Sequence, residues 1–144
     1  MSDLRPILLV DDNPMDIELT LAAFRKHRLA NPVLIARDGQ ESLDWIPRWE
    51  AQESTPCVIL LDINMPKVNG IRVLETLKSH PTLRVIPVVM LTTSAEPDDV
   101  KNAYLRFANS YIVKPVNYDK FAVVIDTLQM YWTFINNPCG DVTT

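Results

Sequence analysis

The sequence contains little cysteine and no long apolar run. Only 2 of its 144 residues are cysteines. Cys57 and Cys139 have neither the spacing of a metal site nor the number that a disulfide framework needs. The chain also lacks the roughly 18 consecutive apolar residues that cross a bilayer, and its first residues contain no apolar signal region. We therefore expect reduced thiols, a cytoplasmic protein and no membrane partner.

Charged residues are spread thinly along the chain. The sequence has 14 Lys and Arg against 18 Asp and Glu, which gives a net charge of −4. No run of like charges exceeds a triplet, whereas a nucleic-acid-binding surface needs concentrated basic residues. We expect no nucleic-acid partner, and a length that suits one domain with one substantial core.

Short apolar runs alternate with segments of helical spacing. The runs are Ile7–Val10, Val33–Ala36, Val58–Leu61, Pro87–Leu91 and Tyr111–Val113. Nearly continuous β-branched and aliphatic runs are typical of parallel strands that are covered on both faces. The alternation predicts an α/β fold, in which a doubly wound parallel sheet has right-handed crossovers and helices on both faces.

Capping residues predict where the helices begin. Asn13 precedes a proline and has Asp16 in the following turn, and Asp38 has Glu41 three residues later. Further helices are expected after Asn69, from Pro97, and from about Tyr118 to Ile135. Pro47 falls inside the second helix and is expected to stop or kink it.

Polar residues follow four of the predicted strands. They are Asp11 and Asp12 after the first strand, Asp62 after the third, Thr92 and Thr93 after the fourth, and Lys114 after the fifth. The ligand site of an open parallel sheet lies outside the carboxyl ends of its strands, so these side chains are expected to meet.

Three carboxylates at one edge call for a cation. Two carboxylates about 4 Å apart repel by roughly 4 kcal/mol at an effective dielectric near 20. Mg²⁺ fits, because it takes a few carboxylates and bridges to phosphate oxygen. The expected ligands are Asp11, Asp12, Asp62 and the backbone carbonyl of Asn64.

Each site residue taken alone has an ordinary explanation. Either acid at the first strand end could help to cap a helix, Asp62 could be a turn residue, and Lys114 could be a solvated loop lysine. All these explanations must hold together for the site to disappear, which is improbable at one edge. His27 and His80 have no evident partner in the sequence and are assigned no role.

Four stretches carry the site residues: ILLVDDN from Ile7, ILLDINMP from Ile59 with Gly70 beyond it, VVMLTT from Val88, and YIVKP from Tyr111. Together they resemble the receiver domain of two-component response regulators. The resemblance implies a flavodoxin-like sheet in the order 2-1-3-4-5 flanked by five helices. It assigns Asp11 and Asp12 to Mg²⁺, Asp62 to phosphorylation, Lys114 to phosphate binding, and Thr92 with Tyr111 to a switch pair.

Longer stretches, such as DDNPMDIELT and ANSYIVKPVNYDKF, are similar to the single-domain regulators of bacterial phytochrome histidine kinases. This resemblance implies a receiver domain over 1–136, a tail over 137–144 and no output domain. The expected function is that of a response regulator in a phosphorelay, which accepts a phosphoryl group from a histidine kinase and is not an enzyme. The alternative is a pseudo-receiver that works without phosphorylation. An aspartyl phosphatase would need a second acid where this chain has Asn64.

The last predicted helix has almost no polar stripe. A helix that is apolar nearly all round needs burial on more than one side. Tyr131, Trp132 and Phe134 are expected to stay exposed in a monomer. We expect a homodimer through this helix and the C-terminal extension, as the resemblance also implies. The alternative is that the tail after Asn136 folds back and covers them.

Overall fold

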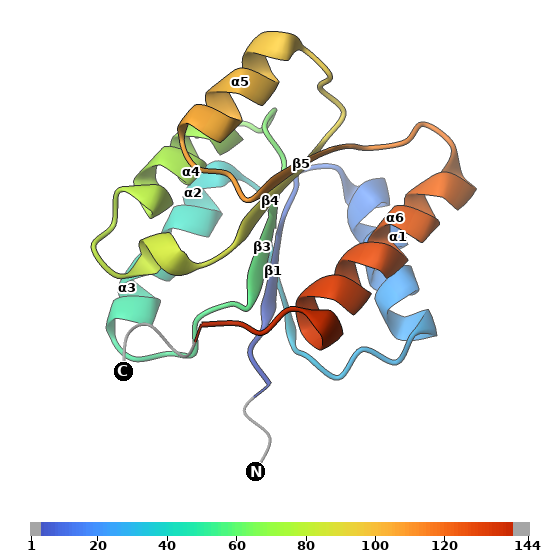
Figure 1. The fold of residues 1–144 in the computed structure, drawn as a ribbon, viewed down its shortest axis with the longest axis horizontal. Helices are drawn as coiled ribbons and strands as arrows, with labels where there is room; N and C mark the ends of the chain where they lie inside the picture. Colours follow the sequence, from blue (N-terminus) through green and yellow to red (C-terminus); the bar gives the residue numbers. More distant parts are fainter. Residues whose placement is uncertain (1–3, 140–144) are drawn as a thin grey trace.

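The computed structural model of the chain describes residues 4–139 and contains a five-stranded parallel sheet. The strands are β1 (Ile7–Val10), β2 (Val33–Ala36), β3 (Val58–Leu61), β4 (Val88–Thr92) and β5 (Ser110–Val113). They lie in the order β2-β1-β3-β4-β5, which confirms the expected topology (Figure 1). Val10 of β1 pairs in register with Leu61 of β3. The residues that follow these two strands therefore begin at the same level of the sheet.

Helices cover both faces of the sheet. They are α1 (Pro14–Lys26), α2 (Gly39–Leu43), α3 (Trp45–Glu50), α4 (Gly70–Lys78), α5 (Pro97–Leu105) and α6 (Tyr118–Met130), with a 3₁₀ turn η1 (Leu83–Val85) and a π-helical turn η2 (Tyr131–Ile135). Helices α1 and α6 cover one face, and α2 to α5 cover the other (Figure 1). Leu8 of β1 shares a cluster with Leu74 of α4, whereas Leu9 shares the opposite cluster with Phe24 of α1 and Ile125 of α6. Burial on both faces explains why the strands lack a polar alternation.

The predicted capping residues begin the helices. The Asn13 side chain accepts hydrogen bonds from the backbone N–H groups of Met15 and Asp16, and Asn69 accepts one from Arg72. Asp38 caps α2 in the same way through the N–H of Glu41. These bonds satisfy donors that have no partner inside a helix.

Pro47 divides the second expected helix into α2 and α3. Proline has no N–H to donate to the carbonyl of Leu43, and its ring would clash with that carbonyl. Helix α2 ends at Leu43, the chain turns at Asp44, and Pro47 lies in the first turn of α3. A missing N–H is harmless in a first turn, so α2 and α3 together form one of the five expected helical segments.

The last helix is buried on one side. Ile125 and Leu128 are buried, whereas Tyr131 and Phe134 of η2 are 44% and 84% exposed. The expectation that Trp132 stays exposed with them is wrong, because it is half-buried against the cluster formed with α1. Trp132 follows Leu128 by one helical turn and therefore lies on the same face.

The described part of the C-terminal tail does not cover Phe134 of η2. Arg5 donates hydrogen bonds to the carbonyl of Cys139 and, at 2.9 and 2.7 Å, to the carbonyls of Thr55 and Pro56. The tail residues up to Cys139 are themselves exposed, and so is Phe134. Residues 140–144 of the expected tail lie outside the described residues. Among residues 4–139, no helix has the length and apolar character needed to cross a membrane.

Candidate functional site

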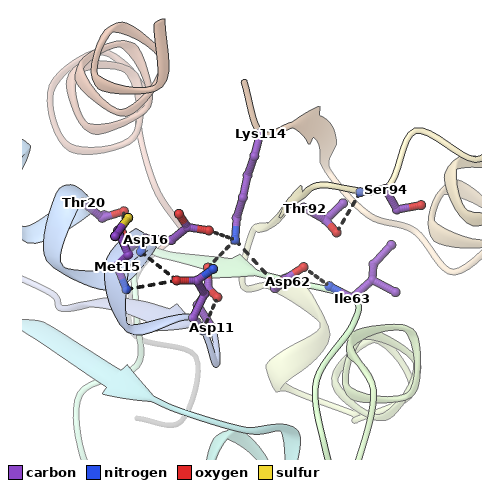
Figure 2. Close-up of polar contacts among 10 residues, drawn as sticks. Asp11, Met15, Asp16, Thr20, Asp62, Ile63, Thr92, Ser94 and Lys114 are labelled. Atoms are coloured by element: carbon purple, nitrogen blue, oxygen red, sulfur yellow. Dashed lines mark hydrogen bonds and ion pairs between the residues drawn. The ribbon is translucent and has the colours of Figure 1, made fainter. Parts of the chain in front are cut away.

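The carboxyl ends of β1, β3, β4 and β5 bring four of the predicted residues together. Lys114 reaches from the end of β5 toward Asp11 and Asp62 (Figure 2). Its Nζ donates to Oδ2 of Asp11 at 2.6 Å and to Oδ2 of Asp62 at 3.4 Å. Asp11, Asp62, Thr92 and Lys114 are 2%, 7%, 0% and 6% exposed. This edge therefore buries charged groups that are solvated in most proteins.

Three acids at this edge have the geometry of a cation site. One carboxylate oxygen from each of Asp11, Asp12 and Asp62 lies within 4.8 Å of the others. Asp11 and Asp62 are buried and Asp12 is exposed, so the cluster opens to solvent on the side of Asp12. Convergent carboxylate oxygens suit a hard cation such as Mg²⁺. Asn64, two residues after Asp62, is exposed, and its carbonyl as a further ligand stays a prediction.

Burial and pairing have opposite effects on the charges of the site. Burial raises the pKa of the Asp11 carboxyl, although Lys114 and the N–H of Asn13 stabilise its charged form. Burial alone would lower the pKa of Lys114, but its hydrogen bonds to Asp11 and Asp16 outweigh burial and raise the pKa. Lys114 therefore remains an ammonium and offsets part of the negative charge around it.

Asp16 belongs to the site as well, although the sequence suggested only a role in the first turn of a helix. Its Oδ2 accepts a hydrogen bond from Nζ of Lys114 at 2.9 Å. Helix α1 begins directly after the acids that end β1, so its first turn lies at the same edge of the sheet (Figure 2). The short distance in sequence between Asp11 and Asp16 was the signal that could have identified it.

The backbone next to Asp62 is held by the start of α4. Oδ1 of Asp62 accepts from the N–H of Ile63 at 2.7 Å, and the N–H of Gly70 donates to the Ile63 carbonyl at 2.8 Å. A Cβ at Gly70 would lie 2.0 Å from the carbonyl oxygen of Asp62. Only glycine allows α4 to approach the acid this closely.

The expected switch pair meets at a residue that the sequence did not single out. The hydroxyl of Thr92 accepts from the N–H of Ser94 at 3.3 Å, and the hydroxyl of Tyr111 donates to the Ser94 carbonyl at 2.8 Å. Burial raises the pKa of Tyr111, and the carboxylates of Asp99 and Asp62 raise it further. Its hydroxyl therefore keeps its proton and acts as a donor. Thr93 is exposed and does not join the site.

Both histidines have partners, contrary to expectation. Nε2 of His27 lies 2.5 Å from a carboxylate oxygen of Asp126 on α6, and Nε2 of His80 lies 2.9 Å from one of Glu50. The partners are far away in sequence, so no local pattern indicated them. Neither pair includes a residue of the site.

A protein-family model described as the response regulator receiver domain matches residues 7–126. The chain belongs to this family. Receiver domains are signalling domains rather than typical enzymes, and they bind Mg²⁺ in an acidic pocket. The strand order and the acid cluster of this receiver agree with that family.

Two curated proteins are similar to the chain over most of their length. The receiver is 37% identical over 135 residues to the probable methanogenesis regulatory protein FilR2 of Methanothrix harundinacea, covering 93% of this chain and 87% of that protein. It is 34% identical over 128 residues to the response regulator Rcp1 of Synechocystis, covering 88% and 87%.

Solved structures agree with this relationship. The Mn²⁺-bound form of Rcp1 superposes with a TM-score of 0.88 and 30% identity over 94% of this chain and 99% of that chain. The phosphorylated cyanobacterial phytochrome response regulator RcpA gives a TM-score of 0.87 and 35% identity over 93% and 97%. The receiver therefore has phytochrome response regulators among its relatives.

Proposed function

We propose that this receiver is a phosphoacceptor, in which Asp62 accepts a phosphoryl group from a histidine kinase with Mg²⁺ as the cofactor. The observation that carries the proposal is the convergence of three carboxylates and the Lys114 ammonium at one edge of the sheet, where Asp11, Asp62 and Lys114 are buried. A carboxylate nucleophile, a cation site and a fixed positive charge are the groups that such a transfer needs.

The residues have separate roles in the proposed transfer. An oxygen of Asp62 attacks phosphorus, the new O–P bond forms as the N–P bond to the kinase histidine breaks, and the histidine nitrogen keeps the electron pair. The three aspartates and the Asn64 carbonyl would hold Mg²⁺, which would supply positive charge near the phosphoryl oxygens. Lys114 pairs with a phosphoryl oxygen, and Thr92 donates a hydrogen bond to another.

The switch is proposed to act through Thr92 and Tyr111. Charge-assisted bonds contribute roughly 1.5–3 kcal/mol each, and a shift from 1:99 to 99:1 needs about 5.5 kcal/mol. Bonds from Thr92 and Lys114 are therefore of the right size. Thr92→Ala should leave phosphorylation of Asp62 largely intact and weaken its effect on partner binding.

The kinase is proposed to be of the bacterial phytochrome type. The likeness to the phytochrome response regulator RcpA supports this, whereas FilR2 is named for another process. Phosphotransfer from a purified bacteriophytochrome kinase should be at least tenfold faster than from unrelated histidine kinases. Equal rates of phosphotransfer from all the kinases would contradict the phytochrome assignment but not the proposal that Asp62 is a phosphoacceptor.

Adduct formation tests the central proposal. With Mg²⁺, the native protein should bind one beryllofluoride, seen by ¹⁹F NMR, and should be phosphorylated by acetyl phosphate. Asp62→Asn keeps the shape of the side chain and should do neither. If the native protein forms no adduct, the alternative of a phosphorylation-independent pseudo-receiver is favoured.

A homodimer through the end of α6 is proposed in addition. Tyr131 and Phe134 are exposed apolar side chains on one short segment, and Ile135 beside them is 66% exposed. Exposed apolar patches often mark interfaces. Removing residues from Tyr131 onward should give a monomer in sedimentation, and an unchanged dimer would contradict the proposal.

A further inference from the structure

Ser94 uses all of its polar groups in contacts around the switch pair. Its N–H donates to Thr92 and its carbonyl accepts from Tyr111, while its Oγ donates to Oδ2 of Asp99 at 2.5 Å. The same Oγ accepts from the N–H of Glu96 at 3.4 Å. Ser94 therefore contacts the end of β4, strand β5 and the first turn of α5 at once.

These contacts make Thr92, Tyr111 and α5 mechanically dependent on one residue. The N–H and the carbonyl of Ser94 belong to adjacent peptide groups, so a displacement at Thr92 that rotates Ser94 also moves the acceptor of Tyr111. Asp99 lies in the first turn of α5, where its carboxylate also favours the positive end of the helix. The Oγ–Asp99 hydrogen bond, which we call the Ser94–Asp99 clasp, is the side-chain link by which Ser94 can pull on the helix.

We propose that Ser94, through the Ser94–Asp99 clasp, is the positioning residue that carries a change at Thr92 to helix α5. The inference rests on the proposed function of Asp62, because a phosphoryl group there would be what draws the Thr92 hydroxyl. A hydrogen bond to a carboxylate is strong enough to change a two-state equilibrium about tenfold, which is a usual size for coupling between sites.

The test measures how helix α5 responds to an adduct on Asp62. Backbone amide NMR shifts of Val100 and Ala103 report on α5, and those of Ile63 report on the adduct itself. In the native protein with Mg²⁺, beryllofluoride should shift both groups of signals. In Ser94→Ala and in Asp99→Ala the shift at Ile63 should persist, while the shifts in α5 should fall at least threefold.

Matched variants separate the clasp from general effects on the helix. Asp98→Ala removes a neighbouring exposed acid from the same turn and should leave the α5 response as in the native protein. Ser94→Thr keeps a hydroxyl and should retain the response. In the double variant of Ser94 and Asp99, the α5 shifts should be no smaller than in either single variant, because each substitution removes the same contact.

A second measurement needs no adduct. Thr92→Val should shift the α5 amides in the native background and at least threefold less in the Ser94→Ala background. Equal shifts of the α5 amides with and without the Ser94 hydroxyl, in either measurement, would overturn the proposal. If the native protein forms no adduct, the proposed function fails by itself, and the Thr92→Val comparison still decides whether the clasp couples Thr92 to α5.

Discussion

The carboxyl edge of the sheet and the end of the last helix depart from the usual distribution of residues in opposite ways. At the edge, Asp11, Asp62 and Lys114 are charged and nearly inaccessible. At the helix end, Tyr131 and Phe134 are aromatic and exposed. Burying charge costs free energy unless the charges are paired, whereas exposing a few apolar side chains costs a folded monomer little.

This difference separates the two regions by what holds them in place. The charged residues of the edge pair with one another, so a substitution there should lower the free energy of unfolding. Tyr131 and Phe134 at the helix end are largely exposed, so a substitution there should change association and leave folding alone. Substitutions in the two regions should therefore differ in their effect on folding, and the largest loss is expected at Lys114.

Lys114→Met should be the most damaging change. It leaves Asp11 and Asp62 as buried carboxylates without their common cation, and removing one partner of a buried ion pair costs about 3–5 kcal/mol. Urea denaturation should show this loss in the free energy of unfolding. Mg²⁺ should recover part of it, because the cation replaces the missing charge.

Lys120→Met is the control for this change, since Lys120 is exposed on α6. It should leave the free energy of unfolding within about 0.5 kcal/mol of the native value. If Lys114→Met were equally neutral, the buried carboxylates of Asp11 and Asp62 would not depend on Lys114.

Gly70→Ala should be the next in size. The new Cβ would lie 2.0 Å from the Asp62 carbonyl oxygen, so backbone must move, at a cost of about 1–3 kcal/mol. Gly39→Ala is the matched comparison, because its Cβ would lie 1.8 Å from the carbonyl of Val68 instead. Both should unfold at lower urea, and only Gly70→Ala should directly displace Asp62 and weaken beryllofluoride binding. Equal binding in both variants would count against the role of Gly70 at the acid.

Asp16→Asn should have a smaller effect. It replaces a carboxylate that Lys114 contacts at 2.9 Å, while Asp11 and Asp62 remain as partners. The loss should be about 1 kcal/mol in urea denaturation. Glu18→Gln, an exposed acid on the same helix, should change nothing measurable. A native-like Asp16→Asn would mean that two carboxylates suffice to hold the lysine.

Phe134→Ser should change folding least of all. The side chain is 84% exposed, so the free energy of unfolding should stay within about 0.5 kcal/mol of the native value. The dissociation constant of the proposed homodimer should rise at least tenfold in sedimentation. Phe107→Ser, at a position 74% exposed beyond α5, is the control and should leave association unchanged. Weaker association in both variants would indicate nonspecific contact rather than an interface at η2.

The strands and the convergence of the site could be predicted because they depend on local composition. Apolar runs located β1 and β3 to the residue, and the rule for open parallel sheets then placed Asp11, Asp62, Thr92 and Lys114 together. The break before Pro47 followed from the chemistry of proline alone.

The remaining contacts depend on tertiary geometry that no local pattern encodes. The hydroxyl of Ser94 reaches Asp99 because of the path of the loop between β4 and α5. His27 pairs with Asp126 because α1 packs beside α6. The burial of Trp132 could not be predicted, because a helix that is apolar nearly all round does not show which face packs on the core. Trp132 lies on the same face as Leu128.

The hydrogen bond from Arg5 to the Cys139 carbonyl offers a way to follow attachment of the tail in solution. Cys139, whose carbonyl Arg5 holds, has an exposed thiol, while Cys57 is buried and burial raises its pKa. A maleimide dye should therefore label Cys139 selectively, without any engineered cysteine. Arg5 precedes β1, so a dye on Cys139 would lie at the opposite end of that strand from Asp11. Its anisotropy would follow attachment of the tail without disturbing the chemistry at Asp62.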